Sequence, residues 1–318
     1  MDIAIPGEPR LVKRILVTGA GGFIGRPVAE ILSRAGHEVH AIQRADSPSR
    51  LPPGVTGHRG DLLDAADVRR VLAEARPQAL IHLAWITEHS RYWDDPSNFR
   101  WLDASVGLFR DFLDAGGESC LAAGTSAEYD WSSAGPLDEE RSAMQPRMRY
   151  GEYKYATFLE GEELFARQGQ PFAWARFFCP FGPGEDARRL IPKTCLRLLR
   201  GERISFDAAS QVRDFLHVED AAGAVAALAQ SSVSGPVNIA SGEPRSVRAV
   251  VEEIAKCLGA EDRVEFGDAA PPADEPQSIS ASIGRLRSLT NWRPAATFSE
   301  RIAQACEWWK ALPPADIP

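Results

Sequence analysis

The chain has 318 residues, 44% of them hydrophobic and 25% charged, with a formal net charge of −8. This length predicts one large α/β domain or two domains, and the composition excludes a disordered, collagen-like or coiled-coil protein. The negative charge gives no general attraction to nucleic acid, and no apolar run approaches the roughly 18 residues of a membrane span. Residues 1–6 lack the charged and then apolar pattern of a signal peptide. We therefore expect a cytoplasmic protein without a membrane or nucleic-acid partner.

The cysteines and histidines form no recognisable metal or disulfide pattern. The five cysteines contain no CxxC pair, and the six histidines are scattered without an HExxH motif. Structural zinc sites and disulfide frameworks depend on such spacings. We therefore expect no metal site and no disulfide framework.

Strand-like and helix-like segments alternate through the first half of the chain. Short aliphatic and β-branched runs predict strands at residues 15–17, 38–42, 55–59, 80–84 and 119–123. Apolar spacing and capping residues predict helices at residues 23–34, 65–75, 99–115 and 150–167. Strands that alternate with helices at this spacing predict a parallel sheet with helices on both faces.

The second half of the chain is less regular. Proline and glycine interrupt residues 179–184, and residues 271–276 form a polar, proline-rich loop. Apolar patterns predict helices at 187–200, 218–230 and 247–258, and short strands at 203–206 and 237–240. We interpret this half as a smaller unit that closes over the end of the sheet.

A glycine-rich turn joins the first predicted strand to the first predicted helix. Gly19, Gly22 and Gly25 have GxxGxxG spacing directly after Thr18. Such glycines permit a tight turn and let the backbone approach a pyrophosphate at the positive end of the helix. The pattern in this context predicts a dinucleotide site, and the alternative is a tight packing turn without a ligand.

The ends of the second and third predicted strands bear on the choice of cofactor. A carboxylate at the end of the second strand would bind the adenosine ribose, whereas an arginine would pair with a 2′-phosphate. The chain has Gln43 and Arg44 there, with Arg50 nearby, so NADP is favoured and NAD stays possible. Asp61, followed by Leu62, could accept a hydrogen bond from the adenine amino group or could serve only the local turn.

Tyr150 and Lys154 are four residues apart in a predicted helix and so share one face. A lysine ammonium beside a phenol favours the phenolate and lowers the tyrosine pKa, which would make Tyr150 a usable acid or base. The alternative is a surface aromatic–cation pair.

Taken in order, the motifs resemble those of the extended short-chain dehydrogenase/reductase family, whose members are nucleotide-sugar epimerases, dehydratases and reductases. The resemblance runs from about Lys13 to Trp309. The matching motifs are TGxxGxxG at 18–25, Asp61–Leu62, His82–Leu83–Ala84, Thr125 before Tyr129, YxxxK at 150–154, Arg176–Gly184 and Arg213–Val218.

The resemblance implies a role for each matching position. Tyr150 resembles the catalytic acid/base, Lys154 the residue that holds the nicotinamide ribose, and Thr125 the hydroxyl that binds the reacting sugar oxygen. Arg213 resembles the arginine that clamps a nucleotide diphosphate, with a structural salt bridge as its alternative. The cofactor-binding positions are Gly19, Gly22, Phe23, Ile24, Gly25, Arg44, Asp61, Leu62, Leu83, Ala84, Tyr150 and Lys154.

Two positions depart from the family pattern. Ala127 stands where the dehydratases carry a glutamate and the epimerising reductases a cysteine. Glu128 is one place further on and would point elsewhere in an extended segment. Cys179 is the substrate-binding position where many relatives have an asparagine that contacts the substrate diphosphate. The resemblance therefore implies a different contact with the diphosphate at this position.

These features predict a Rossmann-type, doubly wound parallel sheet with a smaller C-terminal substrate domain. The Rossmann domain is expected at residues 1–178 and 214–240, and the substrate-binding domain at residues 179–213 and 241–318.

The favoured function is NADP-dependent ketoreduction of a nucleotide-activated sugar, with a 4-keto-6-deoxyhexose as the leading substrate. Tyr150 would protonate the carbonyl oxygen with help from Thr125. The first alternative is a nucleotide-sugar 4-epimerase that retains NAD. A 4,6-dehydratase is disfavoured by Ala127, and a non-catalytic dinucleotide sensor by the presence of both Tyr150 and Lys154.

A homodimer is also expected, because two helices at about 99–115 and 150–167 pack against their copies in relatives. Their apolar positions suit such an interface or the protein's own sheet. These positions are Leu102, Val106, Phe109, Phe112, Phe158, Leu159 and Phe165.

Overall fold

A computed structural model describes residues 13–44, 50–88, 91–133, 135–272 and 274–312. Within these residues a seven-stranded, all-parallel sheet has the order β11-β6-β5-β4-β1-β2-β3. Its strands are β1 (Arg14–Thr18), β2 (Glu38–Gln43), β3 (Val55–Arg59), β4 (Ala79–His82), β5 (Ser119–Thr125), β6 (Phe172–Phe177) and β11 (Gly235–Ile239). The strand order reverses between β1 and β4, which is where such sheets bind ligands.

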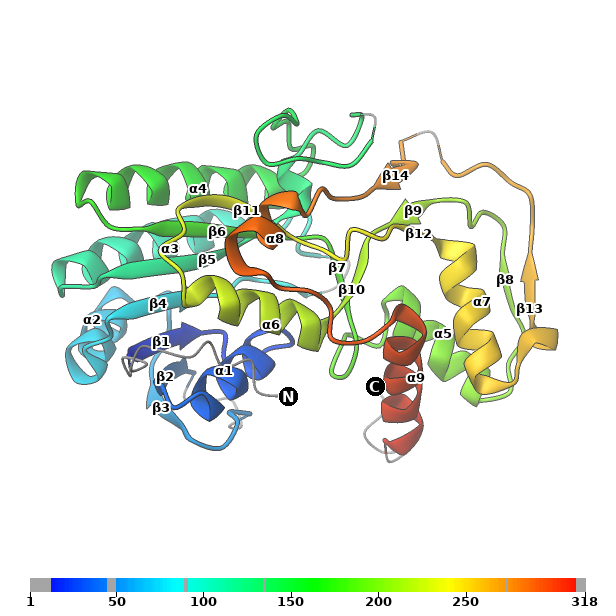
Figure 1. The fold of residues 1–318 in the computed structure, drawn as a ribbon, viewed down its shortest axis with the longest axis horizontal. Helices are drawn as coiled ribbons and strands as arrows, with labels where there is room; N and C mark the ends of the chain where they lie inside the picture. The colour runs from blue at the N-terminus through cyan, green and yellow to red at the C-terminus, as the bar shows by residue number, and fades with distance from the viewer. Residues whose placement is uncertain (1–12, 45–49, 89–90, 134, 273, 313–318) are drawn as a thin grey trace.

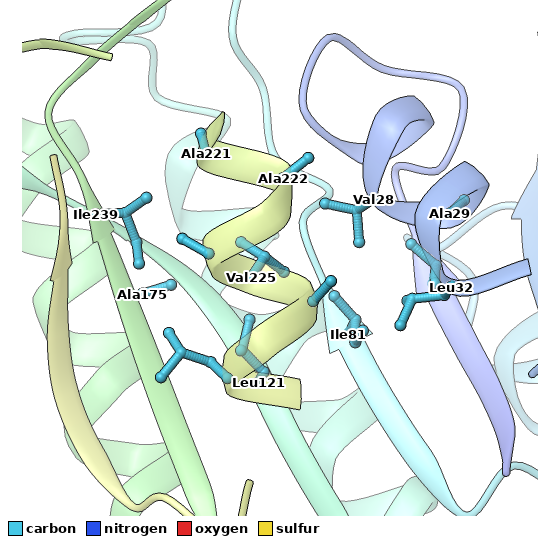
Figure 2. Close-up of a cluster of buried hydrophobic side chains, with 14 of the residues drawn as sticks. Val28, Ala29, Leu32, Ile81, Leu121, Ala175, Ala221, Ala222, Val225 and Ile239 are labelled. Carbon is cyan, nitrogen blue, oxygen red and sulfur yellow. The ribbon is translucent and has the colours of Figure 1, made fainter. Parts of the chain in front are cut away.

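One face of the sheet is covered by α1 (Gly25–Arg34) and α6 (Val218–Ala229), as Figure 1 shows. Six of the eight buried residues of α6 are alanine or valine, and such small side chains let the helix lie close to the strands. Figure 2 shows side chains of both helices meeting apolar residues of β4, β5, β6 and β11. The predicted alternation of strand and helix is confirmed by this arrangement.

The other face is covered by α2 (Ala65–Ala75), α3 (Asn98–Asp114) and α4 (Arg149–Arg167), and its core is rich in aromatic rings. Five of the seven apolar positions suggested for a dimer are buried in the protein itself, namely Val106, Phe109, Phe112, Phe158 and Phe165. Phe99 and Leu159, by contrast, are 59% and 46% exposed on the outer side of α3 and α4. An interface on these helices would therefore use different residues from most of those the sequence suggested.

The C-terminal part forms a second core beside the carboxyl ends of the strands. Helices α5 (Leu190–Leu199), α7 (Val247–Leu258) and α9 (Phe298–Ala311) pack together there. The short strands are β7 (Cys179–Phe181), β8 (Ile204–Phe206), β9 (Val212–Arg213), β10 (Phe215–His217), β12 (Arg245–Ser246), β13 (Val264–Phe266) and β14 (Ser278–Ile279). One later helix, α8 (Gly284–Thr290), returns to the large sheet, where Leu286 joins its core.

Several boundaries differ from the sequence-based expectation. The helix expected from residue 23 begins at Gly25, and the one expected from residue 187 begins at Leu190. Strand β6, with six consecutive buried residues, was not expected, because Arg176 interrupts its apolar run. That arginine is buried through an ion pair with a residue of another element, which a local pattern does not reveal.

Other findings concern membranes, metals and cysteines. In the described part of the chain, none of the helices is both long and apolar enough to cross a membrane. The same residues contain no cluster of three or more His, Cys, Asp or Glu side chains arranged to hold a metal ion. All five cysteines are free thiols.

Candidate active site

The glycine-rich turn lies at the carboxyl end of β1 and requires its glycines for space. Gly19 has a φ of +71°, and a Cβ there would lie 2.9 Å from the Ala84 nitrogen. A Cβ on Gly25 would lie 2.0 Å from the Gly19 carbonyl oxygen. Helix α1 has no side-chain cap and no acidic residue in its first turn, so its positive end is open to an anion. These features fit a bound pyrophosphate.

A series of buried hydrogen bonds fixes residues 82–84, which lie against this turn at the end of β4. The Thr18 hydroxyl accepts the Ala84 N–H (3.2 Å) and bonds to His82 Nδ1 (2.8 Å). His82 Nε2 bonds to the Ser105 hydroxyl at 2.9 Å, and Ser105 donates to the Trp101 carbonyl. Burial lowers the pKa of His82 to about 3, so the ring is neutral. Leu83 and Ala84, expected to contact the cofactor, are thereby held against the glycine turn.

The end of β2 carries the residues expected to bind the adenosine ribose of the cofactor or its 2′-phosphate. Arg44 is exposed there, and its carbonyl accepts a hydrogen bond from Arg59 Nη1 at 3.0 Å. The Arg50 Cβ lies 3.4 Å from the position that a Cβ of Gly21 would occupy. Arg50 thus lies beside the glycine turn, and Arg44 lies at the end of β2.

Asp61 shapes the turn after β3, as the local alternative predicts. One of its carboxylate oxygens accepts the Leu63 N–H at 2.9 Å, and its side chain is exposed. The cap of α2 is Asp64, which accepts the Ala66 N–H at 2.8 Å.

Thr125 and Tyr150 meet because α4 packs directly on the turn η1 (Ser126–Glu128) that follows β5. A Cβ on Gly151 would lie 2.3 Å from the Ala127 carbonyl oxygen, so only glycine allows this approach. The Thr125 hydroxyl accepts the Ala127 N–H at 3.2 Å and shares a hydrogen bond with the Tyr150 side chain. The Thr125 proton is therefore free to be donated to the Tyr150 oxygen.

Lys154 lies one turn further along α4 and is buried. Its ammonium donates to the Ala123 carbonyl oxygen at 2.8 Å and lies 4.0 Å above the centre of the Trp85 ring. Burial lowers the pKa of Lys154 to about 7, and the negative charge of Glu128 opposes this change. Contacts of this kind hold the ammonium beneath the end of β5.

Tyr150 differs from the expectation in one respect. Its pKa is raised in the protein alone rather than lowered, chiefly because the phenol is buried, and the Thr125 hydrogen bond acts in the opposite direction. Spacing along α4 places Lys154 near Tyr150, but the Lys154 ammonium is directed to Ala123 and Trp85.

An aromatic group surrounds Tyr150, and sequence reasoning missed it. The Tyr92 and Trp93 rings meet the Tyr150 ring edge to face, with centroids 4.9 and 5.8 Å away. Trp131 contacts Trp93 in turn, at 6.3 Å. The available signal was a pair of aromatic residues in the loop after β4, at the same sheet edge as the glycine turn.

Glu128 also departs from the expectation. Residues 126–128 form a short 3-10 turn rather than an extended segment, so the alternation argument does not apply. The carboxylate does face away from the reaction centre, because it pairs with Arg176 Nε at 2.7 Å. It is fully buried between β5 and β6.

Of the three expected substrate-binding residues, Cys179 and Arg213 line one cavity of about 350 Å³ beside β7, and Thr125 does not. Arg213 pairs there with Glu275 at 3.1 Å, and its role as the arginine that clamps a diphosphate stays a prediction. Asp214 instead accepts hydrogen bonds from Ser241 and Gly242. Cys179 is a neutral thiol, since burial raises its pKa to about 11.

Two further charged residues of this cavity were not singled out from the sequence. Glu185 is buried, accepts the Gly182 N–H at 3.4 Å and faces Arg189 at 3.5 Å. Burial raises the pKa of Glu185 to about 8. At neutral pH this cavity therefore presents two arginines, one paired carboxylate and one largely protonated acid.

The chain matches known proteins over most of its length. The sequence model of the NAD dependent epimerase/dehydratase family matches residues 15–240. The chain is similar to GDP-6-deoxy-D-mannose reductase of Pseudomonas aeruginosa, with 26% identity over 95% of this chain and 98% of that protein. It is also similar to the 3-diazoavenalumate denitrifying reductase of a Streptomyces species, with 28% identity over 95% and 97% of the two chains.

The fold agrees with that of a solved relative. The crystal structure of UDP-glucose 4-epimerase from Thermus thermophilus, in complex with NAD, matches with a TM-score of 0.83 and 25% identity. The match covers 94% of this chain and 99% of that one. The predicted Rossmann-type α/β fold is thereby confirmed.

Proposed function

Since the chain belongs to the NAD dependent epimerase/dehydratase family, we propose that it is an NADP-dependent ketoreductase of a nucleotide-activated 4-keto-6-deoxy sugar. Its relatives are NAD(P)-dependent oxidoreductases, epimerases and dehydratases of the extended short-chain type, and the chain is an enzyme of this type. One of them is named as a reductase of a GDP-linked 6-deoxy sugar.

The observation that carries the proposal is the make-up of the group around Thr125. Position 127, where a second acid or base would act, is an alanine. The adjacent carboxylate, Glu128, is turned into a buried ion pair. Simple reduction of a carbonyl needs one proton donor, whereas dehydration, or epimerisation at a carbon beside the carbonyl, needs a second group that moves a proton on carbon.

In the proposed reaction the bound dinucleotide supplies the hydride. Tyr150 donates its phenolic proton to the carbonyl oxygen, and Thr125 hydrogen bonds to the same oxygen and orients the substrate. Lys154 holds the nicotinamide ribose and stabilises the phenolate by its charge. The raised pKa of Tyr150 suits an acid that holds its proton until the substrate oxygen takes it.

The substrate's diphosphate is assigned to the cavity of Arg189 and Arg213. A protonated Glu185 would not repel this group and would offer it a hydroxyl donor. Cys179 stands at the position of the usual asparagine and offers only a weak donor there.

A nucleotide-sugar 4-epimerase is the second candidate, because the same Thr125, Tyr150 and Lys154 set would serve it and the fold matches a UDP-glucose 4-epimerase. Such an enzyme keeps its NAD through the catalytic cycle. The absence of an acid at Gln43–Arg44 favours the reductase.

Replacing Tyr150 with phenylalanine should lower the rate of keto-sugar reduction by about 10²–10⁴-fold, because the ring and its packing stay while the proton is lost. NADPH binding and the melting temperature should change little. Steady-state kinetics with GDP- and dTDP-linked 4-keto-6-deoxyhexoses measure this. The matched control is Tyr155→Phe on the same helix, and full activity of Tyr150→Phe would contradict the assignment.

The reductase should not exchange ring protons beside the carbonyl, because Ala127 supplies no second acid or base. The 4-keto substrate incubated with enzyme and NADP⁺ in deuterated water should gain no deuterium at C3 or C5 beyond the buffer rate. Mass spectrometry detects the label. Enzyme-dependent labelling would point to an epimerising or dehydrating enzyme instead.

NADPH should bind more tightly than NADH, because Arg44 and Arg50 can pair with the 2′-phosphate. Arg44→Ala should reduce the difference in binding free energy between NADPH and NADH by roughly 1.5–3 kcal/mol, the contribution of a charged hydrogen bond. Fluorescence titration of both cofactors measures it, with the exposed Arg34→Ala on α1 as control. Equal affinities of the unaltered protein for the two cofactors would refute the preference.

A homodimer built on α3 and α4 is part of the proposal, supported by the exposed Phe99 and Leu159 side chains on these helices. The double variant Phe99→Asp/Leu159→Asp should sediment as a monomer at micromolar concentration, because each aspartate would be desolvated at the interface. Leu289→Asp on α8 is the control. A monomeric unaltered protein would contradict the proposal.

A further inference from the structure

Glu128 is the last residue of η1, and its side chain is fully shielded from solvent. Buried carboxylates persist only where several donors satisfy them. Here the donors are the Thr125 N–H at 2.8 Å, Trp174 Nε1 at 2.9 Å and Arg176 Nε at 2.7 Å. The carboxylate is therefore bound by donors from two strands, β5 and β6.

Close packing places this carboxylate directly on the strand that carries the catalytic groups. A Cβ on Gly124 would lie 2.7 Å from a Glu128 oxygen and 2.2 Å from Trp174 Nε1. The residue before Gly124 is Ala123, whose carbonyl receives the Lys154 ammonium, and the residue after it is Thr125. Three consecutive residues of β5 thus connect Glu128 with both groups.

The turn also sets the direction of the Thr125 proton. Thr125 and Glu128 form a reciprocal capping box, in which the threonine hydroxyl accepts the Ala127 N–H and the glutamate accepts the Thr125 N–H. With its oxygen engaged in this way, the hydroxyl proton is available to Tyr150. Loss of the Glu128 bond would loosen the residue from which that hydroxyl projects.

Glu128 also interacts electrostatically with the Lys154 ammonium. Besides the Ala123 carbonyl and the Trp85 ring, the groups around this ammonium are Glu128, His82 and the ring of Trp174, whose centre lies 5.9 Å from Nζ. His82 is neutral, and Arg176 is committed to Glu128 and the Tyr129 hydroxyl. Burial raises the pKa of Glu128 too, and the charge of Arg176 and the hydrogen bonds to the carboxylate oppose that change. As a carboxylate, Glu128 opposes the effect of burial on Lys154, which favours the neutral amine.

We propose that Glu128 is a positioning residue, which fixes the Thr125 backbone and places a carboxylate behind the part of β5 that binds the Lys154 ammonium. This role rests on the proposed function only through the tasks given to Thr125 and Lys154. Glu128 itself touches neither substrate nor cofactor. Replacing Glu128 should therefore change cofactor affinity as well as catalytic rate.

The test compares two variants with the unaltered protein. Glu128→Gln keeps an oxygen for the Thr125 N–H but removes the charge, and the double variant Glu128→Gln/Arg176→Met also removes the cation that would be left unpaired. The control is Glu163→Gln, which removes an exposed carboxylate from α4. NADPH affinity is measured by fluorescence titration from pH 5.5 to 9, with circular dichroism as the check on folding.

Under the proposed function, Lys154 binds the nicotinamide ribose as a cation. The affinity for NADPH should therefore fall as the pH rises through the pKa of this lysine and the ammonium loses its proton. In either folded Glu128 variant this fall should move to lower pH by about one unit, which is roughly a tenfold loss of affinity at pH 8. The Glu163→Gln profile should overlay that of the unaltered protein. A folded Glu128 variant with an unshifted profile would overturn the proposal, as would an unaltered protein without any such fall.

The experiment separates an error in the proposed function from an error in the role of Glu128. An enzyme that reduces no keto sugar but shows the shifted binding profile would keep the role of Glu128 and lose the ketoreductase assignment. Lys154→Ala, which should abolish the pH-dependent fall, identifies the titrating group. If the fall persists in Lys154→Ala, the charge link to Glu128 is wrong.

Discussion

The contact between Gly151 and the Ala127 carbonyl is the constraint on which the candidate site depends. A single methyl group at position 151 would meet that oxygen at 2.3 Å and force α4 away from η1. With glycine, the helix approaches closely enough for the Tyr150 side chain to hydrogen bond with Thr125 at the end of β5. The same approach buries Lys154 under β5. The close packing of α4 on η1 thus determines how Thr125, Tyr150 and Lys154 are arranged in the candidate site.

Burial then decides the electrostatics of this region. Desolvation lowers the pKa of Lys154 and raises that of Tyr150, so both groups favour their neutral forms in the protein alone. An anion such as Glu128 counteracts this for the lysine but works against the phenolate. Charged groups held in a low-dielectric interior act strongly on each other, which explains why one carboxylate beneath the strand has such influence.

The two binding regions differ in how they are built. The candidate cofactor region consists mainly of backbone and glycine, with the open end of α1 and a series of hydrogen bonds from Thr18 to Ser105. The cavity beside β7 consists instead of charged side chains from distant segments, such as Arg213 and Glu275. Backbone architecture is shared across many relatives, whereas side chains of this kind can vary with the ligand.

The sequence by itself determined the parallel sheet, the glycine turn and the helix that carries Tyr150 and Lys154. Each of these depends on local spacing, which a pattern of apolar residues and glycines records directly. Only the tertiary structure decided the partners of Arg213 and Glu128 and the aromatic rings around Tyr150. Glu275 is 62 residues from Arg213, and Arg176 is 48 from Glu128. Such pairs depend on how β6, β9 and the loops pack together, and no local pattern encodes that packing.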